Sequence, residues 1–249
     1  MDRKIRVGAV SYLNTKPLVY GFEQGMMADR VELLNDYPSK LASRLLLDEI
    51  DIALLPVAII PSLPEHHIIS DYCIGSDGEV ASVCLFSDNP LTEIQTILLD
   101  YQSRTSVSLL KILLKEYWKI SPDLVAAEEG YEKNISGKTA GLVIGDRAFT
   151  QRHRSKYIYD LGAAWKEMTG LPFVFAAWVS NKAMDEKFKD DFNKANALGV
   201  NDIEAILQNT ACDLYDLKKY YTKNISYLLD EQKQKGLASF LKYISQSGQ

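Results

Sequence analysis

The stretch that decides the fold runs Val7-Gly8-Ala9-Val10-Ser11-Tyr12-Leu13-Asn14-Thr15-Lys16-Pro17-Leu18. The apolar residues from Ile5 to Val10 are typical of a buried strand, and Pro17 suits the first turn of a helix. Two polar residues, Ser11 and Asn14, lie in the loop between them. In an open α/β sheet, ligands bind at such loops, and the following helix offers free N–H groups to an anion. We expect Ser11 and Asn14 to face a small-molecule cleft, although both are also typical of a helix cap.

The segments that follow repeat the alternation of strand and helix. Residues 31–34 and 51–56 are predicted strands, and residues 39–47 have the apolar spacing of an amphipathic helix. This β-α-β-α-β order predicts a parallel sheet with right-handed crossovers.

The rest of the chain predicts a second α/β unit followed by helices. The composition changes at Ser87-Asp88-Asn89-Pro90, which indicates a crossing into another lobe. We predict two α/β lobes with a ligand cleft between them: lobe one takes residues 1–87 and 178–249, and lobe two is inserted as residues 88–177. Strands are expected at 66–70, 72–74, 80–87, 97–100, 124–127, 140–146, 157–161 and 173–179, and helices at 103–118, 148–152, 163–168, 185–207, 213–221 and 230–244.

Composition excludes several classes of protein. The 249 residues carry a net charge of −5, so there is no basic excess for a nucleic acid partner. The three cysteines are far apart and form no C-x-x-C pair, so neither a disulfide framework nor a metal site is indicated. No apolar run reaches the ~18 residues of a membrane span, and no secretory signal precedes the first strand. We therefore expect a cytoplasmic protein with no membrane partner.

Common catalytic motifs are missing from the sequence. There is no G-x-S-x-G elbow, and neither phosphate-binding loop motif occurs. His66 and His67 follow a proline-rich turn, and His153 lies between two arginines. For all three histidines a surface or structural role is the expected one.

The richest polar segment is 100–106, which follows a strand and opens a helix. Ser103, Arg104, Thr105 and Ser106 bring three hydroxyls and a guanidinium to one helix N-terminus. Free backbone N–H groups, the helix dipole and charge-assisted donors are what an anion needs. A helix cap explains one of these hydroxyls but not all of them, so we predict an anion-binding site here.

Four further residues are candidates for the cleft. Ser82 lies in an apolar run, where its hydroxyl requires a partner. Asp146 ends a predicted strand and either faces the cleft or caps the next helix. Thr169 and Phe173 flank the return to lobe one and are expected at the mouth of the cleft.

Five motifs occur in order along the chain: Ser11-Tyr12-Leu13-Asn14-x-x-Pro17-Leu18, Gly78-x-Val80-x-Ser82-Val83, Ser103-Arg104-Thr105-Ser106, Ile144-Gly145-Asp146-x-Ala148 and Tyr159-Asp160-Leu161-Gly162-x-x-Trp165-x-x-x-Thr169-Gly170-Leu171-Pro172-Phe173-Val174-Phe175-Ala176. With these motifs the sequence resembles a known family, the chorismate dehydratases of the futalosine route to menaquinone. The resemblance covers about residues 5–178, and the helices after it carry little signature. It implies a type II periplasmic-binding-protein-like fold without a transport role.

The resemblance implies removal of water from chorismate, a dicarboxylate, to give 3-(1-carboxyvinyloxy)benzoate. It also implies that Asn14 is a key active-site residue. Because an amide is not a useful base near neutral pH, we expect Asn14 to position the substrate, whose own enolpyruvyl carboxylate takes the proton. Donors at Ser103 to Ser106, with Ser82 as a second contact, would stabilise charge on the ring carboxylate.

Two alternatives remain open from the sequence. The 1,4-dihydroxy-6-naphthoate synthase of the same pathway shares the fold but is associated with a cleft histidine, and none of the three histidines falls on the motifs. A non-catalytic solute-binding protein would be expected to carry an export signal. We expect no cofactor and no metal, since a redox-neutral elimination requires none, and a monomer or a homodimer.

Overall fold

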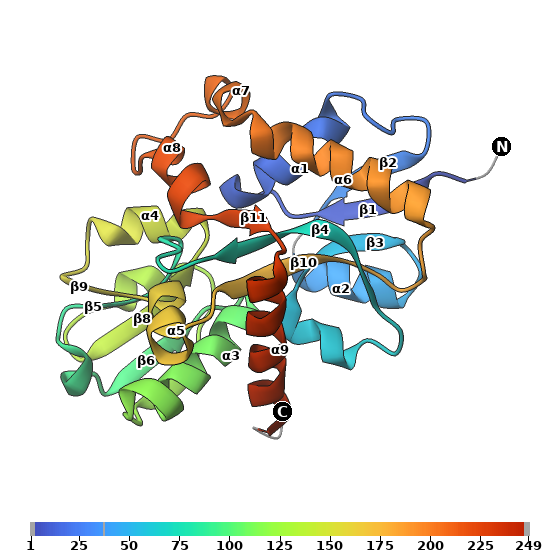
Figure 1. Ribbon diagram of the computed structural model, residues 1–249. Helices are drawn as coiled ribbons and strands as arrows, with labels where there is room; N and C mark the ends of the chain where they lie inside the picture. Colours follow the sequence, from blue (N-terminus) through green and yellow to red (C-terminus); the bar gives the residue numbers. More distant parts are fainter. Residues whose placement is uncertain (1–2, 37, 247–249) are drawn as a thin grey trace.

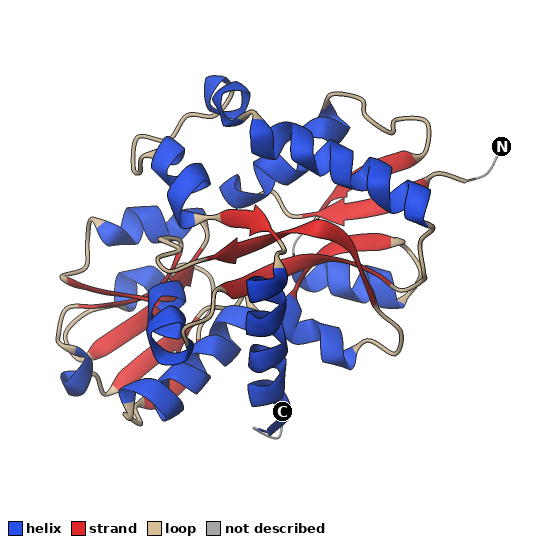
Figure 2. Ribbon diagram, viewed as in Figure 1, coloured by secondary structure: helices blue, strands red, loops and turns tan. Residues whose placement is uncertain are grey.

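The apolar run before Ser11 becomes the strand β1, near one edge of the larger of two sheets. The computed structural model describes residues 3–36 and 38–246 and shows two α/β lobes (Figures 1 and 2). The larger sheet has the order β11-β4-β10-β3-β1-β2. β1 pairs in parallel with β2 and β3, as the β-α-β-α-β pattern predicts. The strands are β1 (Ile5–Ala9), β2 (Val31–Asn35), β3 (Ile52–Pro56), β4 (His67–Ser76), β10 (Phe173–Ser180) and β11 (Ser226–Leu228).

The second lobe is built on a five-stranded sheet of order β7-β6-β8-β5-β9. β6 pairs in parallel with β7 and β8, whereas β5 runs antiparallel to both of its neighbours. Its strands are β5 (Val83–Ser87), β6 (Thr96–Leu99), β7 (Asp123–Ala126), β8 (Thr139–Ile144) and β9 (Tyr157–Asp160).

Helices cover both sheets (Figure 2). The part of the chain that the structure describes holds no helix long and apolar enough to cross a membrane. The α-helices are α1 (Lys16–Glu23), α2 (Pro38–Leu46), α3 (Arg104–Ile112), α4 (Asp146–Arg152), α5 (Leu161–Thr169), α6 (Glu186–Asn201), α7 (Ile203–Gln208), α8 (Leu217–Lys219) and α9 (Glu231–Gln246). Shorter turns are the 3₁₀ segments η1 (Leu13–Thr15), η2 (Val57–Ser62), η3 (Leu91–Glu93) and η5 (Tyr131–Asn134) and the π segments η4 (Leu113–Trp118) and η6 (Tyr220–Asn224).

The chain crosses between the lobes earlier than the boundaries at 87/88 and 177/178 place it. β5 belongs to the second sheet, and the whole of β10 belongs to the first, where it lies between β3 and β4. The outgoing crossing is therefore the loop 77–82, in which Ala81 has a φ of 64°. The composition change at Ser87 to Pro90 marks instead the end of β5, where Pro90 precedes the turn η3.

The C-terminal helices pack on both lobes. α6 crosses α1 closely: a Cβ on Gly21 would lie 2.1 Å from the carbonyl oxygen of Ala195, so only glycine fits there. α9 stands at the junction of the lobes (Figure 1). Its Phe240 ring lies 4.9 Å from Phe173 on β10 and 6.1 Å from Trp165 on α5.

Some expected elements differ in their limits. The helix expected at 185–207 is two helices, because the Asp202 side chain accepts a hydrogen bond from the N–H of Ala205 and starts α7. The strands expected at 66–70 and 72–74 are the single strand β4. The helix expected at 213–221 is reduced to α8 and η6, and β11 follows without having been expected.

Candidate functional site

A cavity lies between the lobes where the predicted polar loops meet. It encloses about 530 Å³ including its open mouth. Its polar side chains are few and its walls are mostly apolar, as in many small-molecule sites. The first lobe contributes Val10, Tyr12, Asn14, Leu54, Pro56, Ile74, Phe175 and Ala176 to the lining. The second lobe contributes Val83, Gln102, Ser103, Ser106, Ile144 and Gly145.

Asn14 lies on the first-lobe wall of this cavity. It stands in η1, the 3₁₀ turn that connects β1 to α1. Its Oδ1 accepts a hydrogen bond from Oγ1 of Thr15 at 3.4 Å, and its main-chain carbonyl accepts one from Tyr227 at 3.1 Å. Asn14 is not a helix cap, since α1 begins after Thr15 and has no side-chain cap.

The N-terminus of α3 supplies the opposite wall, and two of its four predicted residues line the cavity. Ser103 is the N-cap: its Oγ accepts the N–H of Ser106 at 3.1 Å and lies 2.9 Å from the Ser106 hydroxyl. Thr105 is buried, and its Oγ1 accepts the N–H of Ala58 in the first lobe at 3.1 Å. Arg104 is exposed in a separate groove beside η2. Of the four residues predicted to bind an anion, only Ser103 and Ser106 line this cavity. Arg104 and Thr105 point away from it because successive side chains of a helix face different directions.

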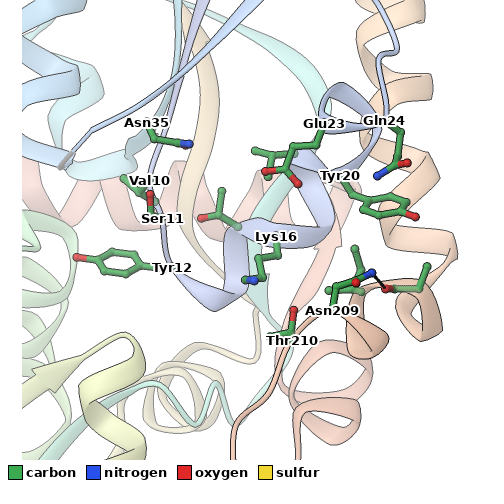
Figure 3. A pocket seen from close by; sticks show the side chains of 14 residues that line it. Val10, Ser11, Tyr12, Lys16, Tyr20, Glu23, Gln24, Asn35, Asn209 and Thr210 are labelled. Carbon is green, nitrogen blue, oxygen red and sulfur yellow. Dashed lines mark hydrogen bonds between the residues drawn. The ribbon is translucent and has the colours of Figure 1, made fainter.

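Ser11 faces a different hollow from Asn14. This second hollow lies on the outer side of the same loop and is also lined by Lys16, Tyr20 and Asn209 (Figure 3). Figure 3 shows Tyr12 pointing to the opposite side of the loop from Tyr20. The loop therefore presents Ser11 and Asn14 to separate spaces.

The remaining predicted residues do not line the interlobe cavity. Ser82 is fully buried behind it, and its hydroxyl accepts a hydrogen bond from Tyr220 at 2.8 Å. Thr169 closes α5, since its Oγ1 donates to the carbonyl of Trp165. Phe173 packs in an aromatic cluster with Trp165 and Phe240, while its neighbour Phe175 reaches the cavity.

Asp146 joins the two lobes beside the cavity. Its Oδ1 accepts the N–H of Leu13 at 3.3 Å, so it holds the loop that carries Asn14. Burial raises the pKa of Asp146, and the hydrogen bond from Leu13 and the charge of Lys16 offset only part of that effect. The preceding residue has a φ of 63°, a conformation that favours glycine, and Gly145 lies beside the ring of Tyr12.

Tyr12 and Gln102 form a contact across the cleft that sequence reasoning missed. The Tyr12 hydroxyl donates to Oε1 of Gln102 at 2.7 Å, and Arg147 donates to the same oxygen at 3.0 Å. Burial raises the pKa of Tyr12 to about 12, so this hydroxyl stays protonated near neutral pH. The guanidinium of Arg147 also donates to the carboxylates of Asp100 and Glu132, each at an N–O distance of 2.6 Å. Tyr12 lies inside the first quoted motif, and Gln102 directly precedes the motif that begins at Ser103, which was the signal available in the sequence.

The cavity walls carry no acidic, basic or histidine side chain among the described residues. His153 contacts the carbonyl of Leu214 at 3.0 Å, and His67 contacts Glu65 at 2.9 Å, both on the surface. In residues 3–36 and 38–246, no three His, Cys, Asp or Glu side chains gather as metal ligands would. The geometry suits recognition of a small ligand by amide and hydroxyl groups.

Comparison with known proteins settles the family. A family profile described as "Menaquinone biosynthesis" matches residues 5–246. The chain belongs to the menaquinone biosynthesis family. Its relatives include a chorismate dehydratase of Thermus thermophilus, 26% identical over 94% of this chain and 93% of that protein. A chorismate dehydratase of Campylobacter jejuni is 29% identical over 94% of this chain and 95% of its own length. The resemblance seen in the sequence motifs is thereby confirmed.

Solved structures confirm the predicted fold of this family member. A protein from Archaeoglobus fulgidus superposes with a TM-score of 0.75 at 15% identity, over 98% of each chain. The periplasmic aliphatic sulphonate binding protein SsuA of Escherichia coli gives 0.64 at 12% identity, over 99% of this chain and 92% of that one. At such identities these likenesses show the periplasmic-binding-protein-like fold alone.

Proposed function

We propose that this protein is a chorismate dehydratase, a cytoplasmic hydro-lyase that converts chorismate to 3-(1-carboxyvinyloxy)benzoate and water in the futalosine route to menaquinone. The observation that carries the proposal is that Asn14 and Ser106, from opposite lobes, line one cavity in a chain of the menaquinone biosynthesis family. Chorismate dehydratases related to this chain over almost their full length support the assignment.

The donors at α3 suit the difficult step of this elimination. The C3–H bond of the ring breaks, its electrons form the new ring double bond, and the C4 hydroxyl leaves, so the ring becomes aromatic. Negative charge reaches the ring carboxylate through the diene while the proton is lost. Ser103, Ser106 and the N–H groups at the start of α3 would stabilise that charge as preorganised donors.

The composition of the cavity wall favours a base supplied by the substrate. Asn14 is an amide, and none of the described lining residues is Asp, Glu, His or Lys. The enolpyruvyl carboxylate is already tethered at C3, where a tethered base gains greatly from proximity. In this proposal Asn14 orients that carboxylate toward the C3 proton.

The test is incubation of the purified protein with chorismate, followed by ultraviolet detection of the aromatic product. We expect turnover by the wild type and, for Asn14→Ala, a fall in kcat of about 100-fold, as for loss of a preorganised polar group. Asn209→Ala, a matched change at an exposed amide in the outer hollow, should keep wild-type turnover.

The other outcomes separate the competing functions. Binding of chorismate without turnover would indicate a solute-binding protein. Neither binding nor turnover would point to the 1,4-dihydroxy-6-naphthoate synthase type, against which the surface positions of His67 and His153 already argue. If Asp146→Asn alone abolished turnover while binding persisted, a protein base would replace the substrate's own carboxylate.

A further inference from the structure

Two tyrosines from the C-terminal part of the chain hold Asn14. The hydroxyl of Tyr227 donates to the main-chain carbonyl of Asn14 at 3.1 Å. The hydroxyl of Tyr220 donates a hydrogen bond to Oγ of Ser82 at 2.8 Å. It also interacts with the Asn14 side chain, which offsets a small part of the rise that burial causes in the pKa of Tyr220. Tyr227 thus holds the backbone of Asn14 and Tyr220 lies beside its amide, and both tyrosines are outside the motifs of the family resemblance.

Burial keeps both tyrosines in the donor form. Tyr220 is fully buried and Tyr227 is 5% exposed. Burial raises the pKa of each hydroxyl far above neutrality, so both carry their protons under ordinary conditions. Neither lines the cavity, which means that they contact Asn14 rather than the ligand.

The surrounding structure holds these two hydroxyls rigidly. Tyr220 starts the π turn η6, and its ring packs edge-on against Phe149 of the second lobe at 5.0 Å. Tyr227 lies on β11, which is hydrogen-bonded to β4 in the first sheet. Ring packing thus sets the position of the Tyr220 hydroxyl, and the pairing of β11 with β4 sets that of Tyr227. Because both groups are held in place, they restrict the positions that Asn14 can take.

We propose that Tyr220 and Tyr227 are positioning residues that fix Asn14 in the geometry needed for chorismate elimination. This inference rests on the proposed function, because it names the supports of the same site. Tyr220 orients the side-chain amide of Asn14, whereas Tyr227 holds the backbone of η1, the turn that contains Asn14. Loss of either hydroxyl should lower kcat and leave KM nearly unchanged, since the residues touch Asn14 and not the substrate.

The neighbouring Tyr221 provides a matched control. It is 2% exposed and lies on the same π turn, but its hydroxyl makes no hydrogen bond to any part of the chain that the structure describes. Tyr221→Phe therefore removes the same atom from an equally buried ring without touching Asn14. It reports what a merely structural change at this turn does to turnover.

The experiment compares kcat and KM for chorismate in Tyr220→Phe, Tyr227→Phe and Tyr221→Phe. We expect kcat to fall about tenfold in the first two, as for a lost hydrogen bond, and to stay within twofold of the wild type in the third. KM should stay within threefold in all of them. Adding Tyr220→Phe to Asn14→Ala should cost no further activity, because Tyr220 acts through Asn14. Equal losses for Tyr220→Phe and Tyr221→Phe, or an additive double variant, would overturn the inference.

A second readout does not depend on activity. The Asn14 side-chain amide signals in an NMR spectrum, identified by their loss in Asn14→Ala, should shift in Tyr220→Phe and stay in place in Tyr221→Phe. If the wild type did not convert chorismate, the proposed function would fail while this shift still reported the support of Asn14. If the signals did not move in Tyr220→Phe, the support itself would be absent.

Discussion

Asp51 is the residue on which the start of the first sheet depends. Its carboxylate accepts the main-chain N–H of Arg6 at 2.9 Å and is paired with the guanidinium of Arg3 at 2.8 Å and of Arg6 at 3.2 Å. Burial alone would raise the pKa of Asp51, but the hydrogen bonds from Arg3 and Arg6 outweigh it and hold the pKa well below its usual range.

We expect Asp51→Asn to lower the free energy of unfolding by about 2 kcal/mol, since an amide N–H would then face a charged donor in a buried site. Urea unfolding monitored by fluorescence measures this. Asp71→Asn, at an exposed carboxylate on β4 that accepts from the amide of Asn193 at 2.8 Å, serves as the control and should cost less. Equal costs would contradict the role given to Asp51.

The same contact predicts a pH dependence. Because folding depresses the pKa of Asp51, its contribution to stability is complete above the unfolded value of about 4 and is lost as the pH falls below it. The difference in unfolding free energy between wild type and Asp51→Asn should therefore be constant near neutrality and shrink in acid. A difference that stayed the same down to the acid transition would exclude this linkage.

Residues of the site were predictable where they lie in or next to a loop between a predicted strand and a predicted helix. Asn14 and Ser103 each lie between a strand and a helix, and Ser106 lies in the first turn of that second helix, which is where a sheet of this kind gathers polar groups. Tyr220 and Tyr227 gave no such signal, because their contact with Asn14 joins parts of the chain that no local pattern relates.

At the scale of elements, one carboxylate joins the crossing loop to α5. Asp160 accepts the N–H of Ala163 at 3.0 Å as the N-cap of α5. It also accepts the N–H groups of Val80 at 3.1 Å and Ala81 at 2.7 Å, in the loop that leads from β4 to β5. The cap therefore fixes the path of the chain between the lobes as well as the helix.

We expect Asp160→Ala to lower the free energy of unfolding by about 3 kcal/mol, since three N–H groups lose their acceptor. Asp185→Ala removes an ordinary cap, whose carboxylate accepts from Phe188 at 2.8 Å, and should cost about 1 kcal/mol. Denaturant curves of the two variants test the difference. Similar losses would mean that Asp160 is a cap and nothing more.

The limits of elements were predictable where local chemistry set them. The parallel strands β1, β2 and β3 match the expected runs closely because a buried parallel strand is a short apolar run between polar residues. β11 has three residues, too few for a pattern, and exists because β4 offers it an edge. The lobe boundaries were harder to predict, since they depend on which sheet a strand joins rather than on its composition.

At the scale of the molecule, the two lobes contact each other across the cleft. The hydrogen bond from Tyr12 to Gln102 crosses the cleft beside the cavity, and Arg147 donates a second hydrogen bond to the same oxygen of Gln102. Because lobes of this kind of fold move as rigid bodies about their crossing strands, such a bond favours the closed arrangement.

We expect Tyr12→Phe to open the ligand-free protein, with a larger radius of gyration in small-angle X-ray scattering. KM for chorismate should rise about fivefold, as for one hydrogen bond of net strength near 1 kcal/mol. Tyr20→Phe, whose ring faces the outer hollow, is the control for both measurements. Unchanged scattering together with an unchanged KM would show that this bond does not set the closure.

The place of β10 in the first sheet has a consequence for synthesis on the ribosome. β3 is buried along its whole length, and one of its two neighbours is β10, which follows the entire second lobe in the chain. At about 5–20 residues per second, β3 waits on the order of ten seconds for that partner. The second sheet, from β5 to β9, is continuous in sequence and can form during this interval. The nascent chain can thus complete the second sheet, in its middle part, before the first sheet. The apolar edge of β3 stays unpaired until β10 is made, which makes that edge a natural point of contact for a chaperone.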